Sequence, residues 1–182
     1  TDEPTRLLGE FRAAREAHQS CVVLATGDPL CHGIAPYLAQ HLCLDALEIL
    51  PNLSTLQLAC ARVGLAWQDA RIVSVHAADA GEWQRGAPPS HGLYALAQAL
   101  RAEQRLLLLT SPANCPDRIA RLLLAEGLGS DFHMAVAEDL LQPDEQVHAQ
   151  LSPTEAASMR FAELNVVLLH QQFRLPGQGG QR

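Results

Sequence analysis

Apolar and polar residues alternate along the chain with two different periods. Short apolar runs rich in valine, isoleucine and leucine indicate buried strands, and longer segments with apolar residues three and four positions apart indicate amphipathic helices. The predicted strands are 21–25, 46–50, 70–76, 105–110, 132–138, 145–152 and 164–170, and the predicted helices are 4–18, 33–42, 53–64, 91–103 and 116–127. Strands that alternate with helices through short links predict a parallel sheet covered by helices.

One segment interrupts this alternation and divides the chain. Residues 77–90 contain Gly81, Gly86, Pro88 and Pro89, and are predicted to form a loop at a boundary between two units. Beyond it, the last two predicted strands follow one another with little helix between them, so part of the second sheet is expected to be antiparallel. The predicted fold class is therefore α/β, with two small α/β domains, the first with a parallel sheet and the second with a mixed sheet. The domains are expected at 1–78 and 79–173, followed by a tail or linker at 174–182.

Composition narrows the class of protein. The chain has 182 residues, of which 48% are hydrophobic, which is enough to bury a core. Its formal net charge of −7 argues against a nucleic-acid partner, because proteins that bind nucleic acid generally neutralise phosphates with an excess of basic residues. No apolar run is long enough to span a bilayer and no secretory signal opens the chain, so we expect a cytoplasmic protein without membrane contact.

Metal or acid–base chemistry is not indicated by the sequence. The five cysteines form no CxxC pair and the eight histidines form no HxH or HExxH pair, so no metal site is predicted. Four acidic residues follow the predicted strand 132–138. We interpret them as a solvated loop rather than an acidic catalytic cluster; they are Glu138, Asp139, Asp144 and Glu145.

Three loops carry the candidate binding chemistry. They are TGDPLCHG (26–33), PNLST (51–55) and TSPANCP (110–116), and each follows a predicted strand and precedes a predicted helix. Ligands of open parallel sheets lie outside the carboxyl ends of the strands, where such loops begin. Glycine permits close backbone approach, and Asp28 can accept hydrogen bonds from a ligand. Taken one at a time, the loops are better explained as ordinary helix caps and turns.

Taken together, the loops and the strands before them resemble the tetrapyrrole (corrin/porphyrin) methylase family over about residues 20 to 170. Gly27-Asp28-Pro29 with Gly33 resembles the second cofactor motif of that family. The stretch WQDAR at 67–71 is typical of the branch that methylates C5 of a precorrin.

This resemblance implies methyl transfer from S-adenosylmethionine to a carbon of a precorrin, with the cofactor held between two α/β domains of a homodimer. A sulfonium methyl group is already activated, so no catalytic triad is required. The cofactor positions carried over by the resemblance are Thr26, Gly27, Asp28, Ser54, Thr55, Thr110 and Ala137. Candidate arginines for the substrate carboxylates are Arg62, Arg71, Arg85 and Arg118. A fused or separate domain that methylates C15 and decarboxylates is a further implied partner.

The first twenty residues depart from the family pattern. The family begins with a strand and a GxG loop, and TDEPTRLLGEFRAAREAHQS resembles neither, so the first domain is expected to be truncated at its N-terminus. Two functions therefore remain open. The chain is either a precorrin methyltransferase or a non-catalytic remnant that serves as an interaction or dimerisation module, with an incomplete cofactor site.

Overall fold

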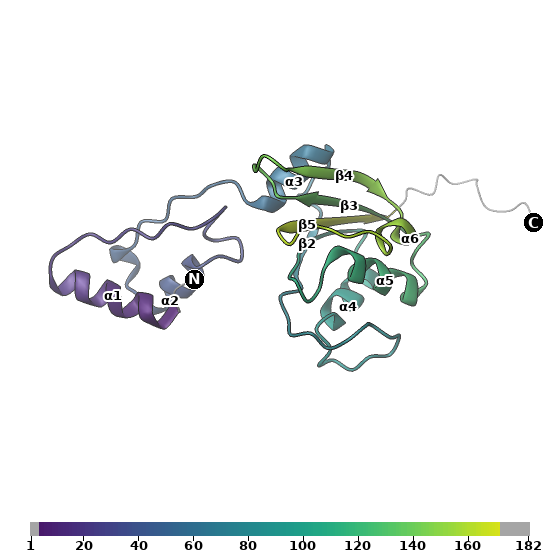
Figure 1. Cartoon of the computed structure of the whole chain (residues 1–182). Coiled ribbons are helices and arrows are strands. Elements are labelled where there is room, and N and C mark those ends of the chain that lie inside the picture. The colour runs from purple at the N-terminus through teal and green to yellow at the C-terminus, as the bar shows by residue number, and fades with distance from the viewer. Residues whose placement is uncertain (1–3, 172–182) are drawn as a thin grey trace, which may run out of the picture. The chain divides into compact units, whose positions relative to one another are not determined.

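A computed structural model describes residues 4–171, apart from the side chains of Pro4 and Leu44 (Figure 1). The chain divides into two compact units, Thr1–Ser54 and Thr55–Arg182, and each is described by itself. The predicted tail at 174–182 lies outside the described residues.

The second unit is built on one mixed sheet of five strands. They are β1 (Arg71–Ser74), β2 (Arg105–Leu109), β3 (Phe132–Glu138), β4 (Gln146–Leu151) and β5 (Asn165–Gln171), in the spatial order β1-β2-β5-β3-β4. β1 runs parallel to β2, whereas β5 lies antiparallel to both β2 and β3, and β4 lies antiparallel to β3. The predicted mixed sheet and the α/β class are confirmed.

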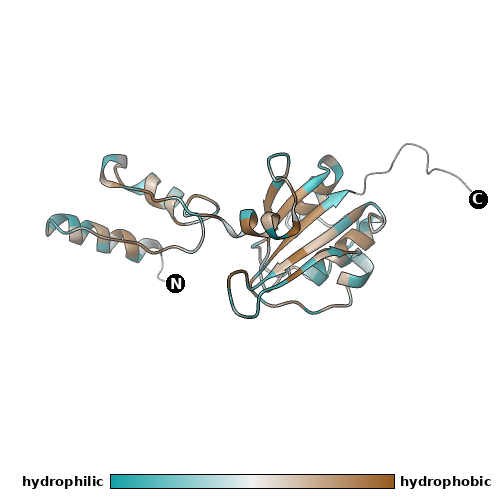
Figure 2. Cartoon of the chain, turned by 90° about the horizontal axis from the view of Figure 1, so that it is seen from above, coloured by the Kyte–Doolittle hydropathy of each residue, from teal (hydrophilic) through white to brown (hydrophobic). Residues whose placement is uncertain are grey.

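Helices cover both faces of this sheet. α4 (Tyr94–Ala102) and α5 (Pro116–Glu126) lie on one face and α3 (Thr55–Val63) on the other, with the short α6 (Pro153–Ala156) beside α5 (Figure 1). The strands are mostly apolar (Figure 2). Alternate strand residues such as Leu106, Leu108 and Phe132 pack into one core with α4 and α5. The periodicity missed α6, which begins with a capping box formed by Ser152 and Glu155.

The first unit contains helices but no strand among its described residues. Its elements are α1 (Pro4–Glu16), α2 (Ala35–His41) and the 3₁₀ turn η1 (Leu44–Ala46). The predicted strands 21–25 and 46–50 are wrong for this structure, because neither segment pairs with another strand, and Val22 and Leu24 are 81% and 92% exposed. A segment of residues with high β propensity forms a strand only when a neighbouring strand pairs with its backbone hydrogen-bonding groups.

The predicted strand 70–76 also differs in its place. We expected it as the third strand of a first-domain parallel sheet, but it forms β1 and pairs with β2 in the second unit. Along the chain, the first unit ends at Ser54 and the second begins at Thr55. The domain boundary at 78/79 stays a prediction. Within residues 4–171, no helix has the length and apolar character needed to cross a membrane.

A row of basic side chains crosses the sheet on the α3 side. Arg105 on β2 and His133 on β3 both pair in register with His170 on β5, and the two histidine rings are 5.5 Å apart between centroids. Burial, followed by the neighbouring His133 and Arg105, lowers the pKa of His170 below its ordinary value of 6.5.

This lowered pKa predicts loss of stability on acidification. The folded state favours neutral His170, so below pH 6.5 the unfolded state binds more protons, and the free energy of unfolding falls until the lowered folded pKa is passed. We expect His170→Gln to flatten this slope in urea unfolding measured at several pH values from about 7.5 down to 5. His32→Gln, at an exposed position of the first unit, is the matched control. An unchanged slope in His170→Gln would contradict the assignment.

Candidate functional site

Three parallel strands end at the same edge of the second unit. β1, β2 and β3 run in one direction, so the segments that follow them, 75–78, 110–116 and 139–145, all leave from this side of the sheet. We call this side the carboxyl edge. It is the edge at which open α/β sheets generally bind ligands.

Two of the predicted cofactor positions come together at the carboxyl edge. Thr110 follows β2 and Ala137 lies near the end of β3, and both flank the first residues of β5. The Thr110 hydroxyl lies 2.7 Å from both the backbone oxygen and Oδ1 of Asn165, and Thr110 is 7% exposed. Ala137 is 1% exposed. The side chains at both positions therefore point into the protein, and the Thr110 hydroxyl is already used by Asn165.

Asn165 is a site residue that sequence reasoning missed. It receives the Thr110 hydroxyl, and its own Nδ2 donates to the backbone oxygen of Ala162 at 2.6 Å. It also pairs in register with Glu138 on β3. Asn165 thus joins the ends of β2 and β3 to the segment before β5. The sequence signal that could have identified Asn165 is its position at the start of a predicted strand, where a polar amide side chain precedes an apolar run.

The loop after β2 fixes the loop after β1. Asn114 is 2% exposed, and its Nδ2 donates to the backbone oxygens of Val75 at 2.8 Å and Ala77 at 3.2 Å. The Ser111 hydroxyl donates to the Val75 oxygen at 3.3 Å. These bonds supply buried donors for carbonyl groups that lie beyond the end of β1. The backbone of 75–77 is therefore held rigidly at the carboxyl edge.

Of the four acidic residues that we interpreted as a solvated loop, Asp144 is exposed, but Glu138 is buried, contrary to our expectation. Glu138 is 5% exposed, and its carboxylate is held by His148 Nε2 at 2.9 Å and by the backbone N–H of Ala162. Glu145 accepts from Arg62 Nε at 2.5 Å, and this pairing lowers the pKa of Glu145. Paired carboxylates can lie in a protein interior that excludes unpaired ones.

The turn between these two glutamates has an unusual backbone. Asp139 and Leu141 have φ angles of 47° and 67°, in the left-handed region that side chains other than glycine rarely adopt. The Leu141 N–H donates to Glu145 Oε2 at 2.7 Å, which stabilises the turn. Such backbone strain is concentrated at functional sites, so it marks 139–145 as a candidate ligand loop.

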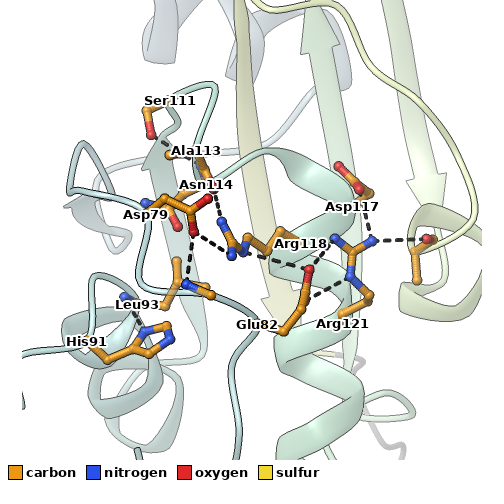
Figure 3. Close-up of polar contacts among 12 residues, drawn as sticks. Asp79, Glu82, His91, Leu93, Ser111, Ala113, Asn114, Asp117, Arg118 and Arg121 are labelled. Carbon is orange, nitrogen blue, oxygen red and sulfur yellow. Dashed lines mark hydrogen bonds and ion pairs between the residues drawn. The ribbon is translucent and has the colours of Figure 1, made fainter. Parts of the chain in front are cut away.

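The loop before α4 is attached to α5 by ion pairs (Figure 3). Arg118 is 8% exposed, with Nη2 2.7 Å from Asp79 Oδ1, and it also donates to the Ala113 oxygen. Arg121 contacts both oxygens of Glu82 at 2.9 and 3.0 Å and Asp117 at 2.9 Å. Hydrogen bonding to Arg118 lowers the pKa of Asp79. These contacts hold residues 79–82 against the first turns of α5.

Each candidate substrate arginine already has a protein partner. Arg62 pairs with Glu145, Arg71 lies 3.7 Å from Glu103, and Arg118 pairs with Asp79. Arg85 donates to the backbone oxygen of Glu126. A substrate carboxylate would have to share or displace these acceptors, so the structure distinguishes none of the four as its binding residue.

In the first unit, the Gly27-Asp28-Pro29 segment forms a compact turn. Gly27 has φ 67°, and Asp28 Oδ1 accepts from the Leu30 N–H at 2.8 Å. The Ala35 N–H, at the start of α2, donates to the Pro29 oxygen at 3.0 Å. A Cβ at Gly33 would lie 2.8 Å from the Pro29 carbonyl carbon, so no larger residue fits there without a shift. Both glycines are therefore required by the turn itself.

The remaining predicted positions lie at the ends of segments. Thr26 is exposed and comes directly before the turn. Ser54 is 6% exposed at the end of the first unit, and Thr55 is the exposed first residue of α3 in the second. The structure thus brings together Thr110 and Ala137 in one unit and Thr26, Gly27 and Asp28 in the other.

Comparison with known proteins identifies the family of the chain. The family model described as tetrapyrrole (corrin/porphyrin) methylases matches residues 2–153. The cobalt-precorrin-7 C(5)-methyltransferase of Salmonella typhimurium is 29% identical over 163 residues, which are 90% of this chain and 71% of that one. The decarboxylating precorrin-6Y C(5,15)-methyltransferase of a Sinorhizobium species is 35% identical over 131 residues, 72% of this chain but 28% of that protein.

A solved structure supports the fold. Uroporphyrin-III C-methyl transferase from Thermus thermophilus, in complex with S-adenosyl homocysteine, superposes with a TM-score of 0.59 at 20% identity, covering 91% of this chain and 72% of that one. The family model spans most of the chain and all three predicted loops. The chain belongs to the tetrapyrrole (corrin/porphyrin) methylase family.

Proposed function

We propose that this chain is a C-methyltransferase, or the C5-methylating part of one, that transfers a methyl group from S-adenosylmethionine to C5 of a precorrin in cobalamin biosynthesis. The observation that carries the proposal is the carboxyl edge of the second unit, where Thr110 bonds to Asn165 and Ala137 pairs with the adjacent Val166, within a chain of this family. The C5 position is supported by the names of the Salmonella and Sinorhizobium relatives.

Tetrapyrrole methylases use S-adenosylmethionine, which supplies an activated methyl group. The residues present fit a cofactor of this kind. The side chains of Thr110 and Ala137 are small and turned inward, so neither obstructs a nucleoside at the strand ends. We propose Thr110 and Ala137 for the adenine and ribose side, and Thr26, Gly27, Asp28, Ser54 and Thr55 for the remaining contacts.

The work of the protein in such a reaction is positioning. The reactive carbon and the activated methyl group must be aligned at near-attack distance. A rigid site that holds them in this geometry removes a large part of the activation barrier. Three features rigidify the carboxyl edge. Asn165 joins two strand ends, Asn114 holds the segment after β1, and Glu138 holds the segment before β5. Each bond restricts a loop that borders the proposed site.

The substrate proposed from the relatives is a precorrin, a macrocycle with several carboxylates. The net charge of −7 would repel such a substrate at long range, so recognition must rest on local donors. Because the candidate arginines have protein partners, we propose that substrate carboxylates replace those partners on binding.

The assembly is also proposed rather than observed. We propose a cytoplasmic homodimer, with a C15-methylating and decarboxylating domain fused to it or separate from it. The length of the Sinorhizobium relative, of which this chain covers 28%, supports a further domain in that protein. We also propose 78/79 as the boundary between the two domains.

The test is a calorimetric titration of the chain with S-adenosylhomocysteine. We expect saturable binding that weakens about tenfold or more in Thr110→Val, because the hydroxyl that holds Asn165 is lost at nearly constant volume. Asp28→Asn keeps an acceptor for the Leu30 N–H but removes the charge, so it tests the first unit. Thr154→Val, at an exposed position of α6, is the matched control.

Two outcomes would contradict the proposal. If the folded parent chain binds no S-adenosylhomocysteine, the chain alone does not form the cofactor site, and the non-catalytic alternative is favoured. If Thr110→Val binds as tightly as the parent, the carboxyl edge is not where the cofactor is held.

A further inference from the structure

A cavity lies in the second unit, between α4 and the loop 83–89. Its volume is about 320 Å³, and its walls include Trp83, Pro88, Pro89, Tyr94, Gln98 and Arg101. Tyr94, Gln98 and Arg101 are four and three residues apart on α4, so they share one face of the helix. The Arg101 end of the cavity lies shortly before the start of β2, towards the edge of the sheet opposite the carboxyl edge.

A buried carboxylate holds the guanidinium of Arg101 in place at this cavity. Glu126, at the end of α5, has a side chain only 5% exposed, and its Oε2 lies 2.9 Å from Arg101 Nη2. Its Oε1 accepts from Trp83 Nε1 at 2.8 Å. Burial raises the pKa of Glu126, but the bonds from Arg101 and Trp83 outweigh burial and hold that pKa below its ordinary value. The guanidinium and the indole ring are therefore held in a defined relative position.

The cavity favours an anion. Arg101 is its one charged wall residue among the residues that the structure describes, and the acidic partner Glu126 is not part of the wall. Within 4–171, only Nη2 of Arg101 is engaged, and its side chain is 53% exposed. The remaining guanidinium donors and the exposed Gln98 amide can hydrogen-bond to a carboxylate.

The rest of the wall favours a flat ring. Trp83 is 6% exposed and packs edge-on against His91, with Tyr94 beyond it at 6.5 Å between ring centroids. Pro88 and Pro89 add rigid side chains to the wall. Aromatic and proline side chains lose little entropy on binding, and a cavity at the lower end of the usual range suits a small ligand.

We infer that this cavity is a binding site for a small aromatic carboxylate, with the ring between Tyr94 and the two prolines and the carboxylate at Arg101 and Gln98. The site is separate from the carboxyl edge and rests on no part of the proposed methyl transfer. The charge supplies the selectivity, because the neutral amide of the same ring keeps the shape and loses the ion pair.

The test is a titration of the full chain with benzoate and with benzamide, followed in ¹H–¹⁵N spectra. The chain has two tryptophans, so two indole N–H signals are expected, and Trp67→Phe identifies that of Trp83. We expect benzoate to shift the Trp83 signal saturably, with a dissociation constant of about 1 mM, and benzamide to bind at least about tenfold more weakly. The Trp67 signal should not move.

Variants locate the site. Gln98→Trp, at an exposed helix position, should fill the cavity and abolish the shift without disturbing the core. Arg101→Gln should weaken benzoate binding about tenfold and Arg101→Lys less, whereas Arg160→Gln, an exposed arginine elsewhere, should have no effect. Equal affinities for benzoate and benzamide, unchanged binding in Gln98→Trp, or no saturable shift with benzoate would each overturn the inference. The ligand comparison and Gln98→Trp decide it even if Arg101→Gln fails to fold.

Discussion

Truncation of Glu138 to alanine is expected to lower the free energy of unfolding of the second unit by about 3 kcal/mol. The side chain is 7% exposed and holds both His148 Nε2 and the Ala162 N–H, so its removal leaves two partly buried donors without this acceptor. Urea unfolding followed by circular dichroism measures the loss.

A double-mutant cycle separates the hydrogen bond from the lost volume. His148→Ala and the Glu138→Ala/His148→Ala double variant should together show a coupling of about 1 kcal/mol or more. Glu163→Ala, at an exposed glutamate close in sequence, should change stability by less than about 0.5 kcal/mol. A cost for Glu138→Ala no larger than that of Glu163→Ala would mean that Glu138 does not hold the 139–162 region.

Substitution of Gly33 by alanine is expected to open the turn that precedes α2. The new Cβ would lie 2.8 Å from the carbonyl carbon of Pro29, which is backbone and cannot rotate away. We expect hydrogen exchange at the Cys31 and Ala35 amides, which donate to Asp28 and Pro29, to accelerate about tenfold or more, corresponding to a cost of about 1–3 kcal/mol.

The same substitution at Gly9 is expected to change stability in the opposite direction. It lies inside α1, and a Cβ there would meet nothing within 4 Å. Gly9→Ala should therefore stabilise α1 by about 0.5–1 kcal/mol, since alanine is the better helix former. If both variants slowed exchange, the close approach at Gly33 would not be what the turn depends on.

Local pattern was sufficient to predict the elements of the second unit apart from the short helix α6. The apolar runs predicted all of its strands, and the predicted helix 116–127 agrees with α5 to within one residue, since α5 ends at Glu126 and Gly127 caps it with φ 78°. These elements have partners within the same unit, so local preference and tertiary packing agree. The runs 21–25 and 46–50 have the same local preference but no strand beside them in the described residues, and they remain unpaired.

The candidate site was less predictable, because its key contacts join residues far apart in sequence. Thr110 was chosen for its hydroxyl, but that hydroxyl is used by Asn165, which was not considered. Glu138 was expected in solvent because it is charged, and it is buried because His148 and Ala162 supply donors from a neighbouring strand and a distant turn. Polarity alone does not reveal whether a partner exists.

The attachment of residues 79–85 to α5 has a consequence for how the second unit opens. This segment has neither helix nor strand, and Gly81 within it, with Gly86, Pro88 and Pro89 just after it, would suit a flexible connection. Asp79 and Glu82 are bound to Arg118 and Arg121, and Trp83 is bound to Glu126. The segment is therefore expected to unfold together with α5 as one cooperative unit, and to resist proteolysis for as long as that helix is intact.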